Sequence, residues 1–225
     1  MSAIAERYDA VRARVIDAAD AADRCADEIT IVAVTKHVGV PEVRQAITAG
    51  CTDFGENRVQ EFLGKYGLFP DVHWHFIGTL QSNKVKDVVG RAYLIHSVDS
   101  LKLLERVNVV AETKGVVQRV LLQVNVSGEG SKHGFEPDDV EEALRAATTM
   151  NGVQVCGLMT IAPFARAESV RWVFRSLAEL FATLNAMRFN GSELHELSMG
   201  MTNDFPIAIE EGATIIRVGT AVFGR

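Results

Sequence analysis

Apolar residues follow two periods along this chain, and the period changes repeatedly. Near the N-terminus, apolar side chains recur at helical spacing, at Ile4, Tyr8, Val11, Val15 and Ala18. This spacing predicts an amphipathic helix. The next apolar run, residues 29–35, is rich in β-branched residues and carries no charge. Such a run is typical of a strand that is covered on both faces.

Strands and helices then alternate to the end of the chain. We expect strands at residues 29–35, 52–54, 73–77, 93–96, 119–126, 153–160, 195–198 and 214–218. Helical patterns separate them, at residues 41–50, 59–63, 82–89 and 101–111, from 137 onward, and at 170–184 and 204–212. Alternating strands and helices predict a parallel sheet. So many units in 225 residues predict an α/β fold, a (β/α)8 TIM barrel with an extra N-terminal helix, forming a single domain over residues 1–225.

An open, doubly wound sheet is the alternative fold. It usually has fewer units and a glycine-rich turn after its first strand. Here that position holds Lys36-His-Val-Gly39 instead. The barrel is therefore the better prediction.

Composition narrows the class of protein. The formal charge is −6 and there is no basic run, which argues against a nucleic-acid partner. No apolar stretch is long enough for a membrane span. The cysteines are three, widely separated and without a CxxC pair, so we expect reduced thiols and a cytoplasmic protein. His73 and His75 share one face of a strand but lack an obvious third ligand, so no metal site is expected.

In a barrel, functional residues lie at the C-terminal ends of the strands. Lys36 follows the first strand, where a position inside the barrel mouth would favour the neutral amine that Schiff-base chemistry requires. The alternative is a lysine whose head simply reaches solvent.

The last two strands are followed by residues suited to a phosphate. Ser198 offers a hydroxyl, Gly200 allows close approach of the backbone, and a helix capped near Asp204 begins just beyond. Gly219-Thr220 follows the final strand in the same way. Such residues also occur in ordinary turns. A Schiff-base lysine facing a phosphate site is more specific, and it points to pyridoxal 5'-phosphate (PLP).

Arg217 precedes Gly219 by two positions and should also point into the mouth. Enzymes that use PLP as a strong electron sink place an acid at the pyridine nitrogen. An arginine there would leave the nitrogen unprotonated, which argues against transamination and favours binding or simple proton transfer. The alternative is an arginine paired with an acid inside the barrel. The polar stretch Ser127–Gly134 lacks P-loop spacing and is expected to form a loop over the mouth.

Short motifs stand at or near the ends of seven of the eight predicted strands. They are Ala33-Val-Thr-Lys36, Phe54-Gly-Glu-Asn57 with Val59-Gln-Glu61, Trp74-His-Phe-Ile-Gly78 with Leu80-Gln-Ser-Asn-Lys84, Gln123-Val-Asn125, Ser131-Lys-His-Gly134, Gly157-Leu-Met-Thr160, Ser198-Met-Gly-Met-Thr-Asn-Asp204 and Arg217-Val-Gly-Thr220. In these motifs, from about residue 29 to the C-terminus, the chain resembles the pyridoxal phosphate homeostasis protein family. Members of that family are single-domain relatives of the alanine racemase N-terminal barrel.

The resemblance implies a role for each of these strand ends. Lys36 would bear the PLP aldehyde, and Arg217 would face the pyridine nitrogen. The remaining contacts would be Asn57 near the ring or its hydroxyl, His75 lining the pocket, and Ser198, Gly219 and Thr220 on the phosphate. Two departures are visible: Arg58 stands where the family often has tyrosine, and Thr79 where proline is usual.

Three functions fit this set of residues. The first is a PLP-binding protein that holds PLP as a Schiff base on Lys36, takes part in vitamin B6 homeostasis and supplies PLP to apo-enzymes. The second is a PLP-dependent amino-acid racemase, and the third a Schiff-base aldolase. A racemase needs a second base, which alanine racemase takes from a tyrosine of a further domain. We expect no such domain after Arg225, and we place Tyr8, Tyr66 and Tyr93 on a helix, a loop and a strand start. We therefore expect a monomeric binder with no secure catalytic residue.

Overall fold

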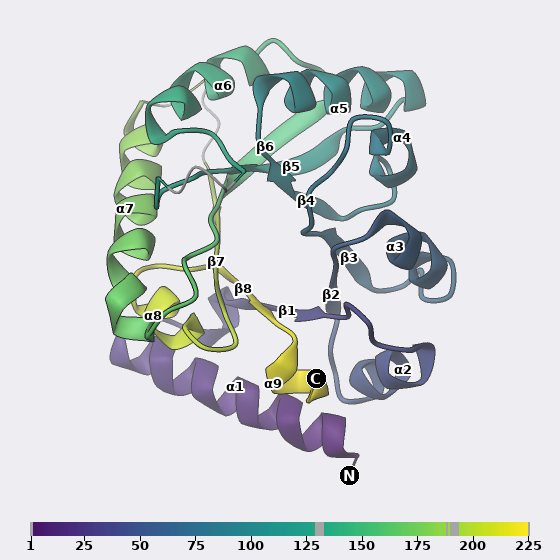
Figure 1. Ribbon diagram of the computed structural model, residues 1–225, viewed down its shortest axis with the longest axis vertical. Helices are drawn as coiled ribbons and strands as arrows, with labels where there is room; N and C mark the ends of the chain where they lie inside the picture. Colours follow the sequence, from purple (N-terminus) through teal and green to yellow (C-terminus); the bar gives the residue numbers. More distant parts are fainter. Residues whose placement is uncertain (1, 129–132, 188, 190–193, 225) are drawn as a thin grey trace.

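The strands close into a barrel in which each strand runs parallel to its neighbours. The computed structural model describes residues 2–128, 133–187, 189 and 194–224. Figure 1 shows the strands as a ring surrounded by helices. In order around the barrel they are β1 (Thr30–Val34), β2 (Asp53–Glu56), β3 (His73–Phe76), β4 (Leu94–Val98), β5 (Gln118–Gln123), β6 (Val153–Met159), β7 (Glu196–Met201) and β8 (Ile215–Val218). The predicted (β/α)8 barrel is confirmed.

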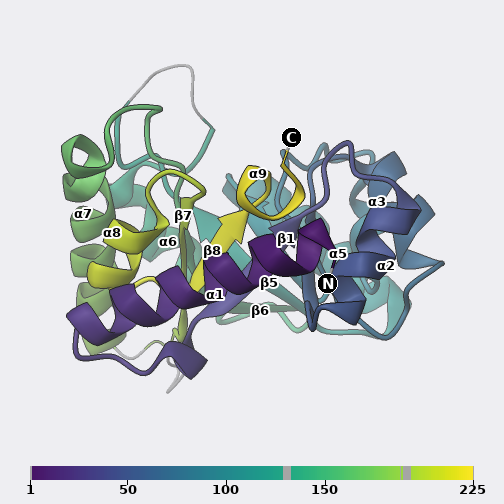
Figure 2. The same ribbon diagram turned by 90° about the horizontal axis from the view of Figure 1, so that it is seen from below.

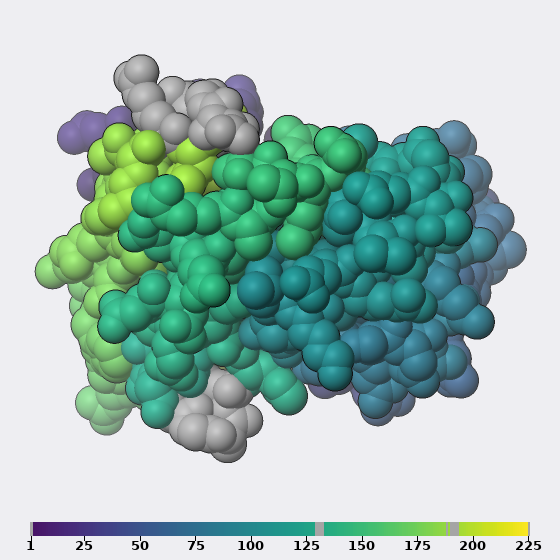
Figure 3. All heavy atoms as spheres, turned by 90° about the horizontal axis from the view of Figure 1, so that it is seen from above, coloured from purple at the N-terminus to yellow at the C-terminus, as the bar shows by residue number. Residues whose placement is uncertain are grey.

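Helices cover the outside of the barrel. They are α1 (Ala3–Ala21), α2 (Val40–Thr48), α3 (Val59–Tyr66), α4 (Val85–Val88), α5 (Leu101–Lys114), α6 (Val140–Ala147), α7 (Ala167–Ala186), α8 (Phe205–Glu210) and α9 (Thr220–Phe223), with 3-10 turns η1 (Ala26–Glu28) and η2 (Pro137–Asp139). The extra helix α1 packs on α2, α8 and α9 (Figure 2). On another side, α5 packs on β5 and β6, and α6 packs on β6. Figure 3 shows this side of the molecule, with the middle of the chain in teal to green.

Some local predictions are wrong in their bounds. The helix expected over residues 82–89 is only the single turn α4, because residues 82–84 form a turn before it. Tyr66 ends α3 rather than lying on a loop. Strand β7 continues to Met201 through a register shift after Ser198. Residues 129–132, in the middle of the loop expected over the mouth, lie outside the described part of the chain.

The core has two compartments. The larger one lies between the strands and the helices and includes Phe54, Phe62 and Trp74. A smaller apolar cluster, which includes Val32, Leu94 and Leu121, is separate from it. Leu94 precedes His96 by two positions on β4, and side chains two apart on a strand share a face. The small cluster therefore lies on the inner face of the barrel, together with polar residues described below.

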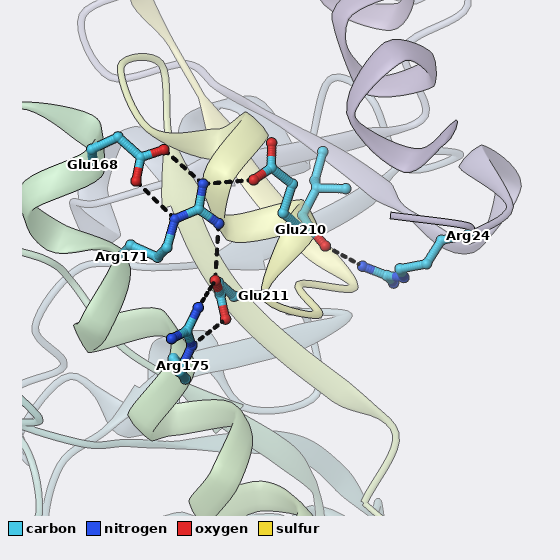
Figure 4. Close-up of polar contacts among 7 residues, drawn as sticks. Arg24, Glu168, Arg171, Arg175, Glu210 and Glu211 are labelled. Atoms are coloured by element: carbon cyan, nitrogen blue, oxygen red, sulfur yellow. Dashed lines mark hydrogen bonds and ion pairs between the residues drawn. The ribbon is translucent and has the colours of Figure 1, made fainter. Parts of the chain in front are cut away.

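An ion-pair cluster on the outside fixes the helix that follows β7. Figure 4 shows Arg171 on α7 between Glu168, Glu210 and Glu211, with N···O distances of 2.7, 2.7 and 2.9 Å. Arg175, one turn further along α7, also contacts Glu211 at 2.9 Å. The cluster joins α7 to the C-terminal end of α8. It therefore helps to hold α8 and the turn that precedes it.

Two absences apply to the described residues. None of their helices is long and apolar enough to cross a membrane. They also contain no group of three or more His, Cys, Asp or Glu side chains placed to hold a metal ion.

Candidate functional site

A cavity of about 390 Å³ lies where β1, β2, β7 and β8 end. It brings together five of the residues that the sequence singled out: Lys36, Asn57, Arg217, Gly219 and Thr220. Its walls also include apolar side chains, among them Val34, Ile77 and Ile161. Ser198, Gly200 and His75 are not among its lining residues in the described structure. The site therefore contains the predicted lysine and arginine, but part of the predicted set lies behind its wall.

Lys36 stands on a turn immediately after β1, and its side chain is exposed. The expectation that the barrel would bury this amine is therefore wrong. The turn itself is tightly held on each side of the lysine. Lys65 Nζ donates to the Thr35 carbonyl at 2.7 Å, and the His37 N–H donates to Glu61 Oε2 at 3.1 Å. The lysine side chain is thus exposed, while hydrogen bonds hold the backbone on each side of it.

A buried ion pair supports this turn from beneath. Glu56, at the end of β2, is fully buried, and its Oε1 accepts from Lys65 Nζ and from Thr35 Oγ1, each at 2.5 Å. Sequence reasoning missed the role of Lys65. The available signal was its position four residues after Glu61 on one helix face, because that spacing places the two side chains together.

Asn57 reaches the cavity because two strand ends approach each other very closely. A Cβ atom on Gly78, just after β3, would lie 2.1 Å from the Asn57 carbonyl oxygen. Only glycine fits there, so Gly78 allows Asn57 its place. The Asn57 Oδ1 atom is buried and has no hydrogen-bond partner among the described residues. A ligand in the cavity could supply the missing donor.

Arg217 is buried on β8, the strand that pairs with β1, and also lines the cavity. One terminal nitrogen donates to Ser198 Oγ at 2.5 Å and the other to the Thr160 carbonyl at 2.8 Å. Burial lowers the pKa of Arg217 to about 10, which still leaves it charged at neutral pH. Among the described residues no carboxylate forms an ion pair with it, although the Asp204 carboxylate is near enough to raise its pKa against the effect of burial.

The end of β7 and the turn after it are shaped by a glycine and an acid. Gly200 has φ +89°, and a Cβ there would lie 2.6 Å from Ala208 Cβ on α8. A side chain at position 200 would collide with α8, so only glycine allows the close packing against that helix. Asp204 occupies the position before α8, but its Oδ1 accepts from the Met201 N–H at 2.6 Å and makes no cap bond to the helix.

Thr202 joins the two turns that border the cavity. Its Oγ1 accepts from the Ala221 N–H at 3.4 Å, and its side chain lines the cavity beside Thr220. The sequence prediction chose Ser198 as the hydroxyl of this motif and passed over Thr202. Only the path of the chain through Gly200 decides which hydroxyl faces the cavity.

Comparisons with known proteins find relatives that match nearly the whole chain. A family model described as the alanine racemase N-terminal domain matches residues 7–225. The pyridoxal phosphate homeostasis protein of Aquifex aeolicus is 43% identical over 223 residues, which cover 98% of this chain and 97% of the relative. The protein of the same name from Pseudomonas aeruginosa is 41% identical over 227 residues, covering 100% and 96%. The structure of PipY from Synechococcus elongatus with PLP bound is 36% identical, with a TM-score of 0.85, and the match covers 98% of this chain and 100% of PipY.

Proposed function

The chain belongs to the alanine racemase N-terminal domain family and to its pyridoxal phosphate homeostasis branch, and from this premise we propose that it binds PLP at the barrel mouth and serves PLP homeostasis. One observation carries the proposal: an exposed amine, Lys36, and a buried cation, Arg217, line one cavity together with apolar side chains. These groups fit a flat aromatic aldehyde that carries a phosphate. PLP itself would supply the electrophilic aldehyde.

Lys36 is the residue that would hold the ligand covalently. Its amine nitrogen attacks the aldehyde carbon, a C=N bond forms, and the aldehyde oxygen leaves as water. The reaction is reversible, and an exposed lysine is accessible both to water and to incoming amines. The exposed position therefore suits loading and release better than a closed catalytic site would.

The phosphate would lie at the two turns that end β7 and β8. Thr202 and Thr220 offer hydroxyls there, and Gly219 allows the backbone to approach. The Ser198 hydroxyl is already bonded to Arg217 and to His96 inside the barrel. We therefore assign Ser198 to holding Arg217, and Thr202 to the phosphate.

A binding and supply role fits the cavity better than racemization does. Racemization requires a second proton carrier across the ring, and none of Tyr8, Tyr66 and Tyr93 lines the cavity. Tyr8 lies on α1, Tyr66 ends α3, and Tyr93 is stacked on His73 at a centroid distance of 4.1 Å. The proposal extends to delivery of PLP to apo-enzymes by a cytoplasmic monomer. The three free cysteines are consistent with the cytoplasmic location, because cysteines remain reduced there.

The test is to trap the ligand on its lysine. The purified protein is incubated with PLP, reduced with borohydride and digested, and the modified peptide is identified by mass spectrometry. We expect the adduct on Lys36 and its loss in Lys36→Ala. Lys102→Ala removes an exposed lysine of α5 and serves as the matched control. Absence of an adduct in the wild type, or an undiminished adduct in Lys36→Ala, would contradict the proposal.

A further inference from the structure

A continuous chain of hydrogen bonds crosses the inside of the barrel, from Arg217 on β8 to Asp53 on β2. Arg217 contacts Ser198 Oγ at 2.5 Å, and the same oxygen lies 2.9 Å from His96 Nδ1. His96 Nε2 lies 2.8 Å from His75 Nδ1, and His75 Nε2 lies 3.0 Å from Asp53 Oδ1. We call these five residues the barrel relay. The cavity contacts only its Arg217 end.

The chemistry of the two ends gives the relay a single direction. Arginine can only donate, so Ser198 Oγ accepts from Arg217; at the other end the ionised Asp53 can only accept, which places the proton of each neutral imidazole on its Nε2 and leaves Ser198 to donate its own proton to His96 Nδ1. His96 therefore carries its proton on Nε2 and donates to His75. His75 likewise carries its proton on Nε2 and donates to the Asp53 carboxylate. Every link is satisfied by one assignment of protons, and reversing any link leaves two donors or two acceptors facing each other.

Burial keeps the two histidines of the relay neutral. His75 and His96 are almost fully buried, and burial lowers the pKa of both, that of His96 well below its usual value. Burial alone would raise the pKa of Asp53, but the hydrogen bonds from His75 and Thr52 hold it below its usual value. The relay thus runs from a cation through neutral groups to an anion. A cation at one end and an anion at the other stabilise hydrogen bonds that are donated in the direction from Arg217 to Asp53.

We propose that His75, His96 and Ser198 are positioning residues, which hold Arg217 so that its remaining N–H groups face the ligand in the cavity. Only two of the five N–H donors of Arg217 have partners among the described residues. Without the relay, Ser198 could turn its proton away from His96, and the guanidinium would lose its fixed acceptor. The proposal rests on the proposed function for the identity of the ligand, but not for the existence of the relay.

The first test uses the protein without ligand. Nitrogen-15 NMR of the histidine rings reports which ring nitrogen carries the proton. We expect His75 and His96 to be neutral and protonated on Nε2 at neutral pH. In Ser198→Ala, the His96 signals should shift because Nδ1 loses its donor. Protonation of either ring on Nδ1, or unchanged His96 signals in Ser198→Ala, would overturn the relay.

The second test measures the effect on binding. PLP is titrated into the wild type, His96→Leu, His96→Gln and the control Ser97→Ala. Ser97 is the neighbour of His96, and its buried hydroxyl has no hydrogen-bond partner among the described residues. We expect His96→Leu to bind PLP about tenfold more weakly, as for the loss of one strong hydrogen bond. His96→Gln, which can still donate and accept, should recover part of that loss, and Ser97→Ala should bind like the wild type.

The outcomes separate the two proposals. If the wild type does not bind PLP, the proposed function fails, while the NMR result still decides on the relay. If the wild type binds and His96→Leu binds equally well, the positioning role is wrong. Circular dichroism checks the fold of each variant. Should His96→Leu not fold, Ser198→Ala replaces it, because it removes only a hydroxyl, and it must then weaken binding for the proposal to stand.

Discussion

The two walls of the cavity present their cations in opposite ways. On the β1–β2 side, Lys36 is exposed on a turn whose neighbours are anchored by the Glu56–Lys65 ion pair. On the β7–β8 side, Arg217 is buried and held by the neutral hydroxyl and imidazole groups of the barrel relay. One wall has an exposed side chain on a backbone that is held by hydrogen bonds. The other has a fixed side chain.

The difference follows from what each cation would do. An amine that forms and breaks a covalent bond must be reached by the aldehyde and by water, so exposure is an advantage. A guanidinium that only donates hydrogen bonds distinguishes best between ligands when the direction of its N–H groups is fixed before a ligand binds. Burying a charge is unfavourable unless its hydrogen bonds are satisfied. The relay meets part of that requirement by giving Arg217 one fixed acceptor, Ser198 Oγ, whereas the exposed Lys36 amine is open to water.

The largest effect is expected from breaking the ion pair of the lysine wall. Lys65→Met leaves Glu56 buried without its cation, which should lower the free energy of unfolding by about 3–5 kcal/mol. Urea unfolding measures this loss. The double variant Glu56→Leu/Lys65→Met removes both charges and should be clearly more stable than Lys65→Met alone.

That comparison also tests the anchoring of Lys36. Because Lys65 donates to the Thr35 carbonyl, both variants release one side of the turn. The double variant should therefore still form the PLP adduct more slowly than the wild type. A single variant as stable as the double, or wild-type rates of adduct formation in both, would contradict this account of the lysine wall.

A smaller effect is expected from the arginine wall, where the free energy of unfolding should depend on pH. His75 and His96 have lowered pKa values when folded, whereas in the unfolded chain both return to about 6.5. Below about pH 6.5 the unfolded chain binds more protons than the folded protein does. The free energy of unfolding should therefore decrease as the pH falls below that value, and the contribution of the two neutral histidines should be complete above it. The charged and titratable groups facing the pair are Arg217, Asp53, His73 and Glu196.

The measurement is urea unfolding between about pH 5 and about pH 8. The decrease toward low pH should be steeper in the wild type than in His96→Leu, which has one fewer buried imidazole to protonate. Asp53, whose pKa is also lowered, should add a further decrease only below about pH 4. Equal slopes in the wild type and His96→Leu would mean that the relay histidines do not remain neutral in the folded protein.

The smallest effect is expected outside both walls, in the cluster that joins α7 to α8. Arg171 is largely covered, with 24% of its side chain exposed, and contacts three acids, whereas Arg175 is 59% exposed and contacts only Glu211. Arg171→Gln should lower the melting temperature by about 2 °C or less. Arg175→Gln should have no detectable effect. A larger loss in Arg175→Gln than in Arg171→Gln would contradict this ranking.

Much of the barrel could be predicted because its cause is local. The apolar run at residues 29–35 and its repeats have the pattern of strands covered on both faces, and their alternation with helices leaves few topologies. The positions of Lys36 and Arg217 followed from counting along strands. The one-turn α4 and the short α9 were missed or misplaced because four residues are too few to show a helical period.

The sequence by itself determined the strand order, the C-terminal mouth and the residues that end each strand there. Only the tertiary structure decided which hydroxyl faces the cavity and which supports it from behind. Ser198 meets a histidine 102 positions away in the chain, and no local pattern reports that contact. It arises because a closed barrel brings the inner faces of distant strands together. There, polar groups must satisfy one another or be left without partners. In this protein Ser198 meets that requirement for Arg217, whereas Lys36, on a turn beyond its strand, remains exposed.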